Sequence, residues 1–108
     1  MTAIQRTTYT KRAERRLESS VSKYPVAAIC YGGDGFIGIT CNRPRFHKHG
    51  GSVHAEMAAM LRWGTAISSI VLIRVTSSGK RKPIHPCEAC QRKADELGIR
   101  IIGDNGDV

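Results

Sequence analysis

The chain has 108 residues, with 17 lysines and arginines against nine aspartates and glutamates, and so carries a net charge of +8. This length predicts a single compact domain over residues 1–108, with flexible ends at 1–7 and 103–108. No run of about 18 apolar residues occurs and the first residues are polar and basic, so we expect neither a membrane-spanning helix nor a secretory signal. We therefore expect a cytoplasmic protein, whose cysteines ligate metal or pack in the core rather than form disulfides.

The spacing of apolar residues and the position of helix-ending residues predict three helices. The first is amphipathic and stops before Pro25, the second follows a loop rich in glycine, and the third stops at Gly98. The predicted helices span residues 8–22, 53–63 and 87–97. In the second helix, the side chains available to face the core are Val53, Met57, Met60 and Leu61.

Four strands are expected in addition to the helices. Residues 26–31 and 36–41 form a hairpin around a glycine-rich turn, and residues 69–75 are a nearly continuous apolar run, as in a strand covered on both faces. A helix links this run to the last strand at 99–102, so these two strands should be parallel. The order predicts an α/β fold, with one mixed sheet flanked by three helices and with basic loops at 42–52 and 76–86. Cys30 and Cys41, on the two hairpin strands, are interpreted as small core residues.

Two short motifs carry the chemistry: His54-Ala55-Glu56, and Pro86-Cys87-Glu88-Ala89-Cys90. Imidazole and thiolate are preferred zinc ligands, and two cysteines three residues apart can grip one ion from a single helical turn. His54, Cys87 and Cys90 therefore predict one zinc ion per chain, with the fourth position left to water as in catalytic sites. Glu56 could then carry the proton of that water without ligating the metal, a pattern typical of zinc nucleobase deaminases.

These motifs resemble those of the cytidine deaminase superfamily, which includes cytidine, deoxycytidylate, tRNA adenosine and polynucleotide cytosine deaminases. The resemblance covers residues 8–102, and Asn42-Arg43-Pro44 is similar to the Asn-x-Pro element of tRNA adenosine deaminases, where the asparagine touches the sugar. The family's usual fifth strand and last helix, which often shape the substrate pocket, are not evident. The resemblance implies a cytidine-deaminase-like three-layer fold with four to five strands. It also implies that Glu56 is catalytic and that Ala55, Pro86 and Cys87 hold the base.

The positive charge is concentrated in residues 35–87, which contain eight cations and only one acid, Glu56. This imbalance suggests a substrate that carries phosphate. The candidate phosphate contacts fall in the two basic loops and comprise Arg43, Arg45, Lys48, Lys80, Arg81 and Lys82. Phe46 lies in the first of these loops, where it either stacks on a base or only fixes its own loop.

The sequence therefore predicts a zinc-dependent hydrolytic deaminase that converts cytosine to uracil in a nucleoside or nucleotide. A polynucleotide deaminase is the alternative, acting on cytosine in single-stranded DNA or RNA, or on adenosine in tRNA. A more distant alternative is a zinc-stabilised binding module without catalysis, in which a nearby His47, His49 or His85 supplies a fourth ligand. The small number of strands also leads us to expect a homo-oligomer, which would cover an apolar face.

Overall fold

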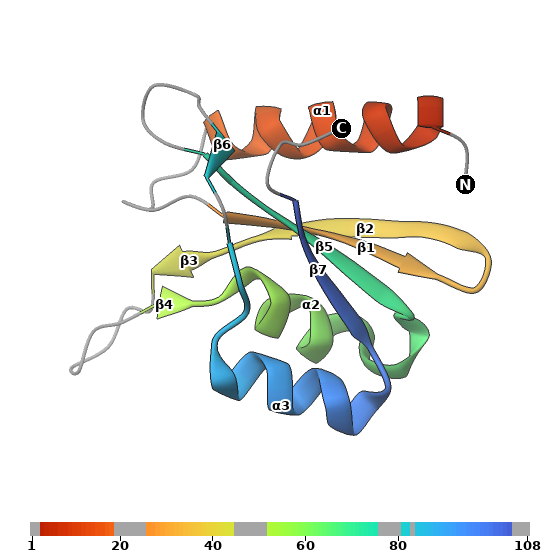
Figure 1. The fold of residues 1–108 in the computed structure, drawn as a ribbon, viewed down its shortest axis with the longest axis vertical. Helices are drawn as coiled ribbons and strands as arrows, with labels where there is room; N and C mark the ends of the chain where they lie inside the picture. The colour runs from red at the N-terminus through yellow and green to blue at the C-terminus, as the bar shows by residue number, and fades with distance from the viewer. Residues whose placement is uncertain (1–2, 19–25, 45–51, 76–80, 83, 105–108) are drawn as a thin grey trace.

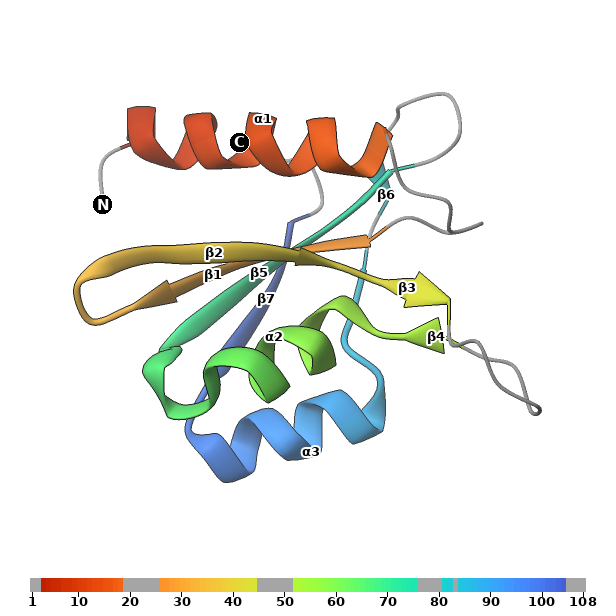
Figure 2. The same ribbon diagram turned by 180° about the vertical axis from the view of Figure 1, so that it is seen from behind.

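The computed structural model describes residues 3–18, 26–44, 52–75, 81–82 and 84–104. They form three layers: α1 (Ala3–Glu18) covers one face of a sheet, and α2 (Ala55–Trp63) and α3 (Glu88–Leu97) cover the other (Figures 1 and 2). The three-helix α/β architecture is thus confirmed. Within the described ranges, no helix is both long and apolar enough to cross a membrane.

The sheet is mixed, as predicted, and has five strands. Strand β1 (Val26–Gly32) lies between its hairpin partner β2 (Gly35–Cys41) and β5 (Ser69–Val75), antiparallel to both. Strand β7 (Arg100–Asp104) pairs with β5 in parallel, which confirms the orientation expected from the intervening helix. The short β6 (Arg81–Lys82) also pairs with β5, within a segment that was predicted to be a loop.

Strands β1 and β5 are almost entirely apolar because helices cover them on both sides. Side chains alternate between the two faces of a strand, so Ala28, Cys30, Ile70 and Leu72 pack in the core beneath α2 and α3. The residues between them, such as Ile29, belong to a second core beneath α1. The prediction of a central strand covered on both faces is therefore confirmed for β5.

The two ends of the described chain are more regular than the sequence suggested. Helix α1 begins at Ala3, five residues before the predicted start of the first helix. Residues 3–7 contain no glycine or proline to stop a helix, although they lack a clear apolar stripe. Likewise, Gly103 and Asp104 were placed in a flexible tail, but they pair with Leu72 and Ile73 as part of β7.

Three local predictions around α2 are also corrected. Leu61 was expected in the core but is 74% exposed, because α2 buries the face that carries Ala55, Glu56, Ala59 and Met60, and the next residue points about 100° away from Met60. The helix begins at Ala55 rather than at residue 53, because residues 52–53 form the small strand β4. Strand β4 (Ser52–Val53) pairs with β3 (Arg43–Pro44) where only a loop was predicted.

Cys30 and Cys41 are packing residues, as interpreted from the sequence. Cys30 is fully buried, and burial raises the pKa of its thiol to about 12, so it stays protonated at neutral pH. Cys41 packs against the core beneath α1; burial raises the pKa of its thiol, while the charge of Arg16 lowers it. The hairpin register pairs Cys30 with Gly38 and Cys41 with Ala27, which keeps the two thiols apart.

Candidate metal centre

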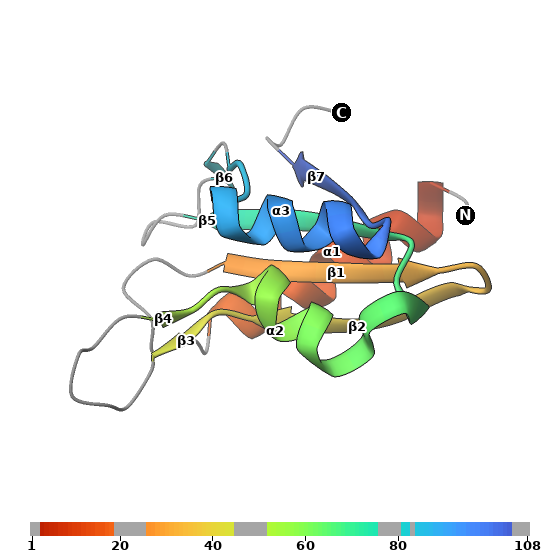
Figure 3. The same ribbon diagram turned by 90° about the horizontal axis from the view of Figure 1, so that it is seen from below.

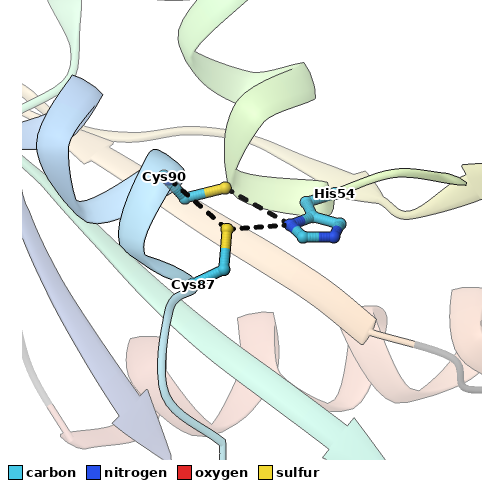
Figure 4. Close-up of side chains that lie close together, drawn as sticks. All are labelled: His54, Cys87 and Cys90. Carbon is cyan, nitrogen blue, oxygen red and sulfur yellow. Dashed lines mark hydrogen bonds between the residues drawn. The ribbon is translucent and has the colours of Figure 1, made fainter.

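The three predicted ligands lie at the beginnings of two neighbouring helices (Figures 3 and 4). His54 is the N-cap of α2, Cys87 is the N-cap of α3, and Cys90 is in the first turn of α3. The first helical hydrogen bonds run from Ala58 N–H to the His54 carbonyl and from Gln91 N–H to the Cys87 carbonyl, each 2.9 Å long. Both exposed ligands are thus fixed at the point where the chain enters a helix.

Cys87 takes the place of the usual serine or aspartate as the N-cap of α3. Its Sγ accepts a hydrogen bond from the Cys90 backbone N–H at 3.4 Å, which satisfies one of the unpaired donors of the first turn. The positive end of the helix dipole favours negative charge on this sulfur. The local fold therefore holds the Cys87 sulfur at the beginning of α3.

The ligand atoms are spaced as zinc requires. His54 Nδ1 lies 3.3 Å from Cys87 Sγ and 3.4 Å from Cys90 Sγ, and all three atoms lie within 4.8 Å of one another (Figure 4). In a tetrahedral site with Zn–S bonds of about 2.3 Å and Zn–N bonds of about 2.0 Å, nitrogen and sulfur are about 3.5 Å apart. The donor set and its spacing therefore fit zinc. His54 and Cys87 are exposed while Cys90 is buried, so the group opens to solvent on one side.

The group contains three ligands within the part of the chain that the structure describes, and His85, although described, is not among them. His47 and His49, the other histidines that could have supplied a fourth ligand, lie outside the described residues. Among the described histidines and cysteines, the arrangement is therefore the three-ligand set that the motif predicted.

Glu56 is buried in the first turn of α2, two residues after His54, with only 4% of its surface exposed. Burial raises the pKa of its carboxyl, against smaller opposing effects from its own backbone N–H and from His54. Burial, the hydrogen bond with Cys87 and the charge of Glu56 raise the pKa of the Cys90 thiol, in that order. The metal-free Cys90 is therefore a neutral thiol, and metal binding must release its proton.

Thr40 is a site residue that the sequence reasoning missed. Its hydroxyl donates a 2.7 Å hydrogen bond to the carbonyl of Ala55, the residue between His54 and Glu56, and Thr40 is only 8% exposed. Thr40 pairs with Ala28, which belongs to the core beneath α2 and α3. The sequence signal that could have identified Thr40 is a hydroxyl at a core-facing position of a strand, because a buried polar group needs a hydrogen-bond partner.

Asn42 closes the open end of the β1–β2 hairpin. Its Oδ1 accepts a 2.9 Å hydrogen bond from Val26 N–H, and its own N–H donates to the Val26 carbonyl at 3.0 Å. These contacts give Asn42 a structural role, and its contact with a sugar stays a prediction. Arg45, Phe46, Lys48 and Lys80 lie outside the described residues. For Arg43, Arg81 and Lys82, the structure describes the backbone of β3 and β6 only.

The segment that leads to Cys87 passes very close to the backbone of β7. A Cβ atom on Gly103 would lie less than 3.0 Å from the carbonyl oxygen of Ile84, three residues before Cys87. Ordinary contact begins at about 3.4 Å, and a backbone carbonyl cannot move aside as a flexible side chain can. Pro86 restricts the backbone conformation between Ile84 and Cys87. Gly103 therefore sets how closely the cysteine-bearing segment approaches the sheet.

Gly103→Ala is accordingly expected to weaken zinc binding by about 10- to 100-fold, the usual effect of disturbing the surroundings of metal ligands. Cys87 would be displaced relative to Cys90, and metal bonds tolerate only about 0.2 Å. Competition with a zinc-chelating dye measures the affinity. Gly32→Ala is the matched control, because its Cβ would press on the Ala66 carbonyl, away from the ligands. Gly32→Ala should lower the melting temperature and leave zinc affinity unchanged. If the two variants bind zinc equally well, Gly103 does not set the position of the segment that carries Cys87.

The sequence and the structure were compared with known proteins. No protein-family model matches the sequence, and no curated protein matches it. Among solved structures, a cytidine deaminase from Burkholderia pseudomallei is similar with a TM-score of 0.66 and 23% identity, over 99% of this chain and 89% of that one.

Two mycobacterial structures agree with this result. A cytidine deaminase from Mycobacterium tuberculosis has a TM-score of 0.59 and 18% identity, over 87% of this chain and 79% of that one. The corresponding protein from Mycobacterium leprae has a TM-score of 0.58 and 20% identity, over 84% and 81% of the two chains. The chain therefore has the fold of these cytidine deaminases.

Proposed function

We propose that this protein is a zinc-dependent hydrolytic deaminase that converts cytosine to uracil in a cytidine or deoxycytidine nucleoside or nucleotide and releases ammonia. The observation that carries the proposal is a buried carboxylate, Glu56, in the same helical turn that follows the ligand His54, beside a three-ligand group that is open to solvent. The fold shared with three proteins described as cytidine deaminases supports the choice of base.

The ligands have defined chemical states in this proposal. Both sulfurs approach Nδ1 of His54, so Nδ1 must offer its lone pair to the metal and Nε2 must carry the ring proton. Cys87 and Cys90 would hold the metal as thiolates, so their thiol protons would be released on binding. Zinc, when bound, supplies the Lewis acidity that makes water nucleophilic at neutral pH.

Glu56 moves the protons of the reaction. Its carboxylate accepts a proton from the water whose oxygen attacks C4 of cytosine, and passes that proton to the ring nitrogen N3. A second proton then travels through the same carboxylate to the amino group, which leaves as ammonia when the C4–N bond breaks. Cytosine and water are thus converted to uracil and ammonia, and Glu56 returns to its starting state.

The neighbours of Glu56 hold it and the base in place. Thr40 anchors the Ala55 carbonyl, which fixes the first turn of α2 and so the directions of His54 and Glu56. We propose that Ala55, Pro86 and the Cys87 backbone contact the base, that Asn42 contacts the sugar, and that Arg43, Arg45 and Phe46 contact the rest of the substrate. Lys48, Lys80, Arg81 and Lys82 remain the candidate phosphate contacts. The homo-oligomeric state and the cytoplasmic location also stay predictions.

A binding module without catalysis is less well supported, because a structural zinc site does not need a carboxylate beside its histidine, and burying Glu56 without a use for it costs stability.

Substrate choice is tested by incubating the zinc-loaded protein with cytidine, dCMP, a single-stranded oligonucleotide that contains one cytosine, and tRNA. Mass spectrometry then detects the exchange of an amino group for oxygen. Product from cytidine or dCMP is the expected result. Product from the oligonucleotide or the tRNA alone would overturn the proposed substrate, and no product from any of them would overturn the enzyme.

A further inference from the structure

A groove lies between α1 and the edge strand β2. Helix α1 covers the face of the sheet opposite to α2 and α3, whose first residues form the metal centre (Figure 1). The volume of the groove is about 350 Å³, and its lining consists of Arg12, Arg15 and Arg16 from α1 and residues 36–39 of β2. None of the described residues that line it is acidic. Neither Arg12 nor Arg15 forms an ion pair with any residue that the structure describes. Among the described residues, the positive charge of Arg12 and Arg15 therefore has no acidic partner.

Aromatic rings lie beside these arginines. Tyr9 and Phe36 stack with their ring centroids 4.0 Å apart and their planes 9° apart, and the Arg12 guanidinium lies 5.2 Å from the Phe36 centroid. Both rings are only partly buried. Planar cations and partly exposed rings are the surfaces on which unpaired bases stack, with about 1–3 kcal/mol per base at typical sites.

The hydrogen bonding of the edge strand β2 favours a chain of phosphates over an acidic peptide as the partner of this groove. An open edge strand invites a peptide to add as a further strand, through the backbone groups of that edge. Here the Arg16 guanidinium donates a hydrogen bond to the Ile39 carbonyl of β2, so this position is already occupied. An acidic peptide cannot pair along β2 at that point. A chain of phosphates needs only the guanidinium groups, which present several donors each.

We propose that this groove binds single-stranded nucleic acid, with phosphates on Arg12 and Arg15 and a base against the Tyr9–Phe36 stack. The two arginines are three residues apart on α1, so their side chains are neighbours and can reach successive phosphates. The inference goes beyond the proposed reaction, because the groove is separate from the metal ligands and recognises the strand rather than a cytosine.

Binding is tested with a fluorescein-labelled oligothymidylate, which contains no cytosine and cannot be turned over by the proposed enzyme. Fluorescence anisotropy gives the dissociation constant of the zinc-loaded protein at several salt concentrations. Arg12→Gln with Arg15→Gln should weaken binding and flatten the log–log salt dependence by about 1.4, since each lost phosphate contact removes about 0.7 from the slope. Arg62→Gln with Arg100→Gln removes the same charge from exposed positions outside the groove, and should leave the slope near that of the unmodified protein.

Several results would overturn the inference. These are an unchanged slope in the Arg12/Arg15 variant, an equal loss in the Arg62/Arg100 control, or competition by polyglutamate as effective as that by unlabelled oligothymidylate. The last result would assign the groove to an acidic protein segment. The double variant Arg12→Lys with Arg15→Lys is the control for a folding defect. It keeps the positive charges that contact phosphate, so the salt dependence should match that of the unmodified protein. A slope as flat as that of the glutamine variant would also count against the proposal.

Discussion

Replacing Glu56 with glutamine is expected to lower kcat by about 10²- to 10⁴-fold while the fold and the bound zinc persist. Glutamine fills the same buried space but has no basic oxygen to take the proton from water. The three metal ligands are unchanged, and burial disfavours the charged form of Glu56, so a neutral isostere costs little stability. Initial rates, zinc content and the melting temperature of one preparation measure the three quantities together.

Glu88→Gln is the matched control for this substitution. Glu88 is also a first-turn glutamate, in α3, but its side chain is 87% exposed and pairs with Arg92 across one helical turn. Its replacement changes the net charge by the same amount, and turnover should stay near that of the unmodified protein. If the Glu56 variant deaminates as fast as the Glu88 variant, Glu56 does not carry the proton.

Cys87→Ser is expected to abolish most of the gain in stability that zinc gives to the protein. Serine is a good N-cap, so the bond from Cys90 N–H is kept and α3 still begins in the same place. Serine is a poor zinc ligand, so the substitution removes one of the three metal bonds and leaves the cap. Metal binding feeds directly into folding stability, and a hundredfold loss of affinity lowers the zinc-dependent gain by about 2.7 kcal/mol.

Thermal unfolding in chelator and in excess zinc separates the two roles of Cys87. In chelator, Cys87→Ser and the unmodified protein should melt at similar temperatures. In excess zinc, the melting temperature should rise only for the unmodified protein. Cys41→Ser provides the comparison, because Cys41 packs on the far side of the sheet beneath α1 and should keep the zinc-dependent gain. A Cys87→Ser protein that zinc stabilises as strongly as the unmodified chain would remove Cys87 from the site.

The features that were predictable from sequence are those encoded in adjacent residues. The apolar run of β5 identifies a strand covered on both faces, and the spacing of Cys87 and Cys90 puts two ligands in one helical turn whatever the rest of the fold does. His54 could be assigned to the same site because the two motifs occur together. Their meeting depends only on two helices that begin at the same end of one layer (Figure 3).

The features that were missed depend on partners far away in the chain. Thr40 and Gly103 look like ordinary strand residues until Ala55 and Ile84 are brought against them. Leu61 has the right chemistry and spacing for the core, but only the position of the sheet decides which face of α2 is covered. Apolar periodicity gives the direction of a buried face to within one residue, which is the error made at Leu61.

We propose that one zinc ion, held by His54, Cys87 and Cys90, makes this chain a deaminase. Zinc is titrated into metal-free protein in the presence of the preferred cytosine substrate, and ammonia release is followed at each addition. We expect no ammonia in chelator and a rate that rises linearly until one zinc per chain has been added, then stays constant. Ammonia release that is undiminished in chelator, or its absence from the fully zinc-loaded protein, would contradict the proposal.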